Sequence, residues 1–148
     1  MRASNRLGKM PSWQRTFVLL AILNCSLTGI AYLLGHEFGI YKALLGQHSV
    51  LAWHGIFAVL ATMALGSVLP VHIKAGFHSK RKRMSGFSQL GLLLILCGSG
   101  LLLYYGPESL RDATILTHWV TGNIFFGMFL MHTVMITKWR ASAKEKEH

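Results

Sequence analysis

Acidic side chains and cysteines are both scarce in this chain. Its 148 residues include five Asp and Glu against fifteen Lys and Arg, and only two cysteines. The acidic residues all lie outside the long apolar runs, at Glu37, Glu108, Asp112, Glu145 and Glu147. The sequence therefore lacks the intramembrane carboxylate that is usual for proton coupling in transporters. Two cysteines, Cys25 and Cys97, are too few for a disulfide framework, and we expect both to be small packing residues.

Apolar residues are gathered into four long runs. Hydrophobic residues make up 52% of the chain and charged residues 14%. No charged side chain lies within residues 17–34, 49–71, 87–105 or 113–137. Each run has about twenty residues, which is the length that crosses the hydrocarbon core of a bilayer. The sequence therefore predicts an all-α integral membrane protein in which residues 1–148 form a single membrane domain, a four-transmembrane-helix bundle.

The expected bounds follow from these runs and the charged segments around them. We expect helices over about residues 15–34, 49–71, 87–105 and 113–138, a basic loop over 73–86, and tails over 1–14 and 139–148. Pro70 is expected to bend or loosen the end of the second helix, because proline removes a backbone hydrogen bond. Gly106 and Pro107 are expected to end the third helix in a short turn. The first run is long for a signal-peptide core and no small-residue cleavage site follows it, so we expect a retained helix.

Basic residues form three clusters that flank the apolar runs. They lie within residues 2–15, 74–83 and 138–146, whereas the other two connecting segments carry little net charge. Because basic residues accumulate on the cytoplasmic side, both termini and the middle loop are predicted to be cytoplasmic. Anionic lipid headgroups are a sufficient partner for the net charge of +10, and no nucleic acid is expected. A bacterial-type inner (plasma) membrane is the expected location of this multi-pass chain.

Histidines occur in pairs on the second and fourth predicted helices. His118 and His132 are fourteen positions apart, and His54 and His72 are eighteen positions apart. At about 100° and 1.5 Å per residue, each pair lies on one helix face, separated by about 21 Å and 27 Å respectively. Both helices run from the outer to the inner side. We therefore expect His54 level with His118 at the outer side, and His72 level with His132 at the inner side.

Histidine within a membrane is costly and is expected to be functional. Imidazoles facing each other at two depths suit the axial positions of two porphyrins, beside which Ala58 and Gly122 would provide room. Phe125 and Phe129 follow on the same face as His118 and suit an apolar wall. The sequence has no Cys-x-x-Cys-His motif, so any haem would be bound non-covalently. His48 is the substitute ligand for His54, and His78 is the substitute for His72.

Further residues are expected to support these ligands. Each histidine needs a partner for its second ring nitrogen, and Thr114, Thr117 and Thr121 lie within a turn of His118. Backbone carbonyls one turn back can serve any of the four histidines. Arg111 is expected to pair with haem propionates near the outer level. Lys74 or Arg15 is expected to do the same near the inner level.

The segment HWVTGNIFFGMFLMH, residues 118–132, resembles a family of small membrane b-type cytochromes. This family includes cytochrome b561-type proteins and the cytochrome b subunits of formate dehydrogenase, nitrate reductase and nickel-iron hydrogenase. The resemblance implies a four- or five-helix bundle that holds one or two bis-histidine haems and exchanges electrons with quinone or a redox subunit. It implies haem b as the cofactor. From the spacing and direction of the helices, His54 and His118 are expected on the outer iron and His72 and His132 on the inner iron.

The predicted function is that of a di-haem membrane cytochrome subunit in a respiratory complex. Such a chain would transfer electrons across the membrane between quinone and a redox partner subunit, and would not be an enzyme alone. One alternative is a cofactor-free anchor subunit of a redox complex. The other is a metal-binding transporter, which is disfavoured because the histidines are split between two levels whereas metal ligands cluster.

Overall fold

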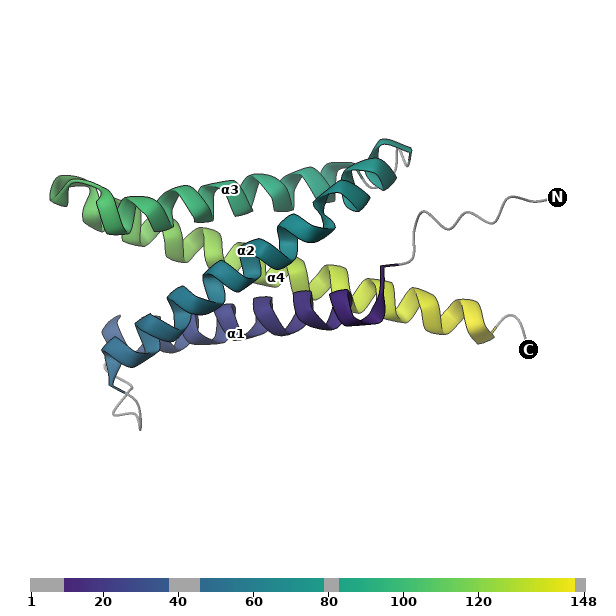
Figure 1. Cartoon of the computed structure of the whole chain (residues 1–148), viewed down its shortest axis with the longest axis horizontal. Helices are drawn as coiled ribbons and strands as arrows, with labels where there is room; N and C mark the ends of the chain where they lie inside the picture. Colours follow the sequence, from purple (N-terminus) through teal and green to yellow (C-terminus); the bar gives the residue numbers. More distant parts are fainter. Residues whose placement is uncertain (1–9, 38–45, 79–82, 146–148) are drawn as a thin grey trace. The chain divides into compact units, whose positions relative to one another are not determined.

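The described chain is all-helical and contains four long helices. A computed structural model describes residues 10–37, 46–78 and 83–145. Its elements, in order, are α1 (Ser12–Glu37), α2 (Gln47–His78), α3 (Arg83–Tyr105), the 3-10 helix η2 (Glu108–Leu110) and α4 (Arg111–Glu145), as Figure 1 shows. Within these ranges there is no β-strand. The prediction of an all-α chain with four helices is confirmed.

Each of the four helices contains a segment long and apolar enough to cross a membrane. These segments are Ser12–His36, His48–Pro70, Ser88–Tyr105 and Glu108–Thr133. Large apolar side chains are exposed along all four helices, including Leu27, Met63, Leu101 and Met131. Such a surface is suited to lipid and not to water. The chain is therefore a multi-pass membrane protein by the length and composition of its helices.

The helices extend further than the sequence predicts. Helix α2 continues through Pro70 to His78, and α3 begins at Arg83, so that most of the expected loop over residues 73–86 is helical. Likewise α4 continues to Glu145 through most of the expected tail. Lys and Arg are good helix formers, so a helix can continue beyond its apolar run. The end of an apolar run therefore marks the end of the lipid-facing segment, not the end of the helix.

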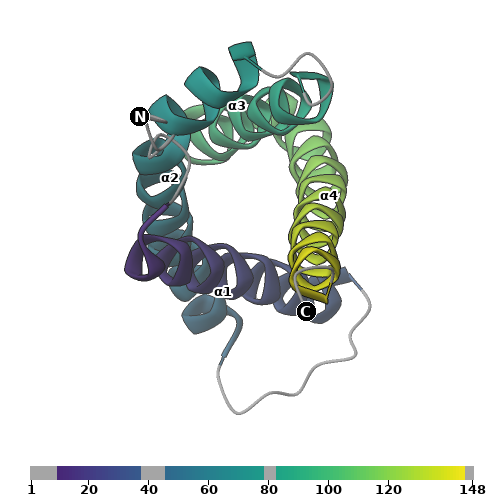
Figure 2. The same ribbon diagram turned by 90° about the vertical axis from the view of Figure 1, so that its right-hand side faces the viewer.

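The chain divides into two compact units, residues 1–86 and 87–148. In the first unit, α2 lies beside α1 (Figures 1 and 2). Near one end of the pair, Gln14 Nε2 donates to Ser67, with the carbonyl oxygen and Oγ both 3.1 Å away. Further along, Cys25 contacts His54, so the two helices are antiparallel. Small and branched side chains are buried along the pair: Val18, Ala21, Ile22, Val50, Ala61, Ala64 and Val68.

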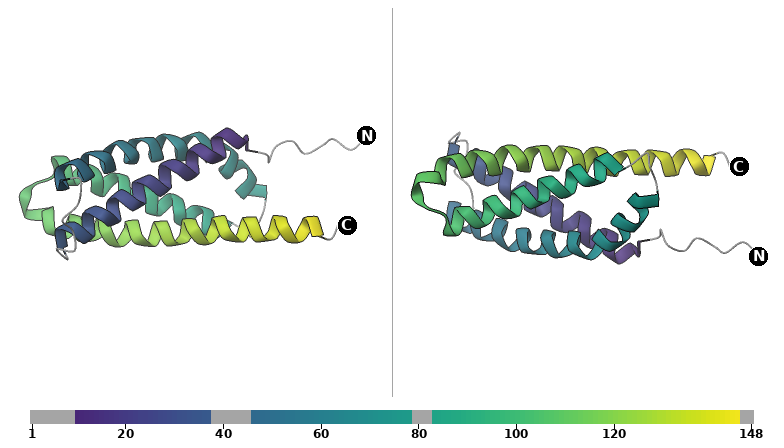
Figure 3. Two further views of the ribbon diagram at one scale, coloured as in Figure 1. Left: turned by 90° about the horizontal axis from the view of Figure 1, so that it is seen from below. Right: turned by 90° about the horizontal axis from the view of Figure 1, so that it is seen from above.

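The second unit is a helix pair joined by a short turn. Helix α3 contacts α4 through Ser99 and His118, and α4 runs as one uninterrupted helix (Figure 3). Gly106 ends α3 as predicted, with its backbone N–H donating to the Leu102 carbonyl at 2.8 Å. A Cβ atom at residue 106 would collide with that carbonyl oxygen. This turn therefore requires glycine because of a close approach within the backbone.

Replacement of Gly106 by alanine should destabilise the second unit. The collision with the Leu102 carbonyl forces the turn to shift, and strain of this kind costs about 1–3 kcal/mol. Thermal unfolding of the protein in detergent, followed by circular dichroism, measures the loss. Gly127→Ala is the matched control, since no atom lies within 4 Å of the added Cβ. An equal melting temperature for both variants would contradict the prediction.

Candidate functional site

His54 lies half-buried on α2 with its ring against α1. Its Nδ1 atom is 3.0 Å from the carbonyl oxygen of Cys25 and 3.4 Å from Thr28 Oγ1. A carbonyl oxygen can only accept a hydrogen bond, so the contact with Cys25 places the hydrogen on Nδ1. In the neutral imidazole, Nε2 then carries the lone pair. This arrangement gives His54 the tautomer that a metal ligand through Nε2 requires.

Gly29 provides the space that the His54 ring occupies. A Cβ atom at residue 29 would lie 2.9 Å from His54 Cε1 and 3.2 Å from Nδ1. Both distances are shorter than ordinary van der Waals contact. The ring can therefore approach the backbone of α1 only because residue 29 has no side chain.

His118 on α4 has a corresponding contact with α3. Its Nδ1 atom is 2.8 Å from Ser99 Oγ, and Ser99 Oγ donates to the Leu96 carbonyl at 3.1 Å. The serine hydroxyl has one hydrogen; when it donates this hydrogen to Leu96, its oxygen can only accept, and it then accepts from Nδ1–H of His118. Ser99 is buried, and His118 Cε1 is 3.8 Å from an added Cβ at Gly100. This arrangement would give His118 the same tautomer as His54.

The hydroxyl found beside His118 Nδ1 is not one named from the sequence, where Thr114, Thr117, Thr121 or a backbone carbonyl was expected. The hydroxyls of Thr114 and Thr117 donate to the carbonyls of Leu110 and Ala113 in their own helix, at 2.8 and 2.7 Å. A threonine in a helix readily donates to the carbonyl of the preceding turn. The partner is Ser99, on the other helix of the pair.

For His54, a backbone carbonyl was expected and is present. It belongs to Cys25 on α1, however, and not to the preceding turn of α2. Two residue pairs, Thr28 with Gly29 and Ser99 with Gly100, therefore support the histidines without having been predicted to do so. In the sequence, both pairs could have been recognised as a hydroxyl residue followed by glycine, in the helix that precedes the helix of His54 or of His118.

The face of α4 that carries His118 is partly as predicted. Phe125 and Phe129 are buried on it, as are Thr114 and Thr121. Gly122 faces α3, where an added Cβ would meet Leu96 Cδ2 at an ordinary 3.7 Å. The face of α2 that carries His54 is also mostly buried: Ala58 is half-buried, and Ala61 and Val68 are buried. The roles of Gly122 and Ala58 beside a cofactor stay predictions.

His72 and His132, the two histidines expected at the inner level, are described less completely. His132 is half-buried on α4, in the same unbroken helix as His118. His72 lies within α2, but its side chain is outside the described part of the chain, as are those of Lys74 and His78. The pairings of His54 with His118 and of His72 with His132 each join the two units, and they stay predictions.

The remaining candidates lie at helix ends or on α1. Arg111 Nη1 is 3.6 Å from Glu108 Oε2, and both side chains are exposed, Glu108 in η2 and Arg111 at the start of α4. This is an ion pair within one turn, so an anionic ligand would compete with Glu108 for Arg111. His48 is exposed in the first turn of α2, and Arg15 is half-buried near the start of α1.

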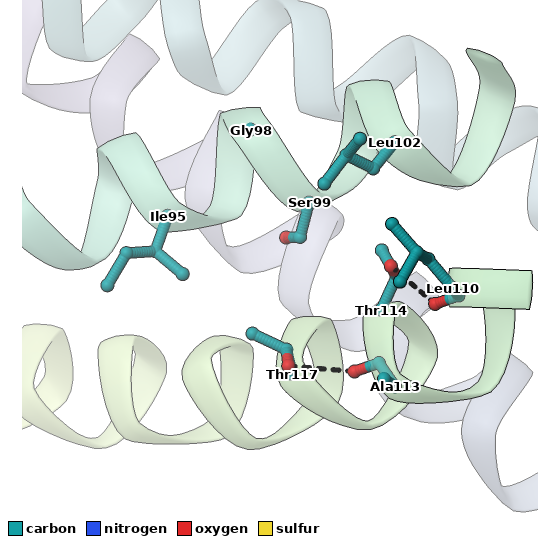
Figure 4. A pocket seen from close by; sticks show the side chains of 8 residues that line it. All are labelled: Ile95, Gly98, Ser99, Leu102, Leu110, Ala113, Thr114 and Thr117. Atoms are coloured by element: carbon teal, nitrogen blue, oxygen red, sulfur yellow. Dashed lines mark hydrogen bonds between the residues drawn. The ribbon is translucent and has the colours of Figure 1, made fainter. Parts of the chain in front are cut away.

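An apolar cavity of about 340 Å³ lies beside Ser99, between α3, η2 and the start of α4 (Figure 4). Ile95, Leu102 and Leu110 contribute its walls. The hydroxyls of Thr114 and Thr117 also line it, but their hydrogens are bonded to backbone carbonyls, shown as dashed lines in Figure 4. The cavity is therefore a mostly apolar recess next to the partner of His118.

The described residues do not form a clustered metal site. Among residues 10–37, 46–78 and 83–145, no three His, Cys, Asp or Glu side chains gather closely enough to hold one ion. Neither Cys25 nor Cys97 forms a disulfide. His54 and His118 are instead single histidines, each held by its own helix pair.

Comparison of the chain with models of protein families, with curated proteins and with solved structures finds no match in any of the three.

Proposed function

We propose that this chain is a membrane b-type cytochrome subunit that carries electrons across the bilayer on two bis-histidine haems. One observation carries the proposal: His54 and His118 each direct Nδ1 to an oxygen atom of the neighbouring helix. Structural histidines have no need of a shared tautomer. Ligands that bind iron through Nε2 do, because Nε2 must carry the lone pair.

The donor set fits haem b better than it fits zinc or copper. A bis-histidine haem needs one imidazole from each side, and each helix pair provides one such imidazole at the outer level. A protein zinc site needs three or four ligands together, and the described residues contain no such group. Haem, when bound, would supply one-electron redox chemistry.

The chain's own residues would position and shield the ligands. Cys25 and Ser99 hold the imidazole rings in one orientation through Nδ1. Phe125 and Phe129 are buried on the face of α4 that carries both His118 and His132. They would exclude water from the porphyrin ring of the haem. Arg111 at the outer end would receive a propionate in exchange for its exposed pair with Glu108.

The inner haem, the orientation in the membrane and the electron partners are proposed from the sequence. His72 and His132 would hold the inner haem, and the basic clusters would place both termini and the loop around residue 80 in the cytoplasm of a bacterial-type cell. Because the segments between the predicted spans are short, a redox partner subunit and a quinone are the proposed electron donor and acceptor. The apolar, exposed helix surfaces suit a subunit of a membrane complex.

The haem-to-protein ratio tests this proposal. The full chain, purified in detergent after expression with haem supplied, should give two haems per chain in a pyridine haemochrome assay. Its reduced-minus-oxidised spectrum should show b-type bands. A ratio of zero would support the cofactor-free anchor subunit, and stoichiometric zinc or copper without haem would support the metal-binding transporter. Either result would refute the proposed cytochrome.

A further inference from the structure

The two outer histidines differ in the group that receives Nδ1–H. For His54 the acceptor is a backbone carbonyl, that of Cys25 at 3.0 Å, with Thr28 Oγ1 further away at 3.4 Å. For His118 it is the side-chain oxygen of Ser99 at 2.8 Å. A backbone carbonyl is present whatever residue occupies position 25. A serine hydroxyl is removed by a single substitution, so the two contacts differ in what mutation can change.

Ser99 is held for this role by its own helix. Its Oγ donates to the Leu96 carbonyl at 3.1 Å, and the side chain is only 6% exposed, so water has little access to replace the hydroxyl. The contacts form a chain in which His118 Nδ1–H donates to Ser99 Oγ and Ser99 O–H donates to Leu96. Each hydrogen bond in such a chain polarises the next and strengthens it.

We propose that Ser99 is the positioning residue that fixes the tautomer of His118 and tunes the iron bound to it. By accepting from Nδ1–H, the Ser99 oxygen keeps the lone pair on Nε2 and makes the imidazole a stronger electron donor. A stronger donor favours the ferric state and lowers the potential of that haem. The effect on potential rests on the proposed function, whereas the effect on the tautomer does not.

The first experiment concerns the tautomer and needs no haem. Nitrogen-15 NMR of the full chain in detergent micelles, with His118 assigned by substitution, distinguishes Nδ1–H from Nε2–H. Wild-type protein should show hydrogen on Nδ1 and an unprotonated Nε2. Ser99→Ala should convert this to a mixture of tautomers, and Ser99→Thr, which keeps a hydroxyl, should restore the wild-type pattern. A wild-type His118 with hydrogen on Nε2, or a Ser99→Ala spectrum identical to wild type, would overturn the inference.

The second experiment concerns the haem-loaded protein. Loss of a ligand's hydrogen-bond partner typically weakens metal binding about 10–100-fold, and we expect Ser99→Ala to weaken haem binding by a similar factor. Redox titration should show that the midpoint potential of one haem becomes more positive while the other stays unchanged. Thr62→Ala is the matched control, because it likewise removes a hydroxyl that donates to a carbonyl of its own helix, that of Ala58 at 2.8 Å, on an exposed part of α2.

The outcomes separate the inference from the proposed function. Two haems in wild-type protein, with affinity and potentials unchanged in Ser99→Ala, would overturn the inference and leave the cytochrome proposal intact. Absence of haem from wild-type protein would refute the cytochrome proposal, and the NMR result would still decide whether Ser99 fixes the tautomer. Equal shifts in Ser99→Ala and Thr62→Ala would indicate general damage to the helix pairs and would also overturn the inference.

Discussion

Replacement of His118 by alanine is expected to remove one of the two haems. Loss of one axial imidazole leaves a single ligand on that iron, and the small alanine cannot supply another. The haemochrome ratio should therefore fall from two to one, with loss of one component from the redox titration. His132→Ala should remove the other component. His48→Ala is the control, because His48 is exposed in the first turn of α2 and its loss should leave two haems.

The same assay tests the pairing of histidines from the two units. If His54 and His118 bind one iron, His54→Ala should remove the same redox component as His118→Ala, and the double variant should lose nothing further. Residues that act as one site are non-additive in this way. Loss of both haems from the double variant would show that the two histidines bind different irons. An unchanged spectrum in every variant would instead support the anchor subunit.

The four helices could be predicted from the sequence because lipid imposes a minimum apolar length on each span. Their ends could not, as α2 shows. Proline at position 70 removes a hydrogen bond to the carbonyl of residue 66, yet the helix continues to His78. Residue 66 is glycine, whose backbone adjusts easily, and proline is tolerated within membrane helices. A basic segment after an apolar run is equally compatible with a loop and with further helical turns.

The candidate ligands could be predicted, but the groups that support them could not. Helical periodicity alone places His118 and His132 on one face of α4. Finding Ser99 requires the register between α3 and α4, since Ser99 and His118 meet only when the two helices pack in one particular alignment. No single-helix pattern contains that register. The threonines near His118 were expected from α4 alone, whereas the hydroxyl oxygen 2.8 Å from its Nδ1 belongs to Ser99 on α3.

Gly29→Ala and Gly100→Ala should have opposite effects, although both replace a glycine in front of a histidine ring. Alanine in a helix is favoured over glycine by roughly 0.5–1 kcal/mol, which would stabilise either variant. At residue 100 the new Cβ meets His118 Cε1 at an ordinary 3.8 Å, so this gain should remain. At residue 29 the new Cβ would lie 2.9 Å from His54 Cε1, and overpacking of this kind costs about 1–3 kcal/mol.

At residue 29 the cost of overpacking exceeds the gain in helix propensity. The His54 ring must move away from α1, which stretches its hydrogen bond to the Cys25 carbonyl and releases Nδ1 from its acceptor. Gly29→Ala should therefore lose the redox component that His54→Ala loses, and melt below wild type in detergent. Gly100→Ala should keep two haems and melt at or above wild type. Two haems and an unchanged melting temperature in Gly29→Ala would mean that the His54 ring does not lie against α1 in the working protein.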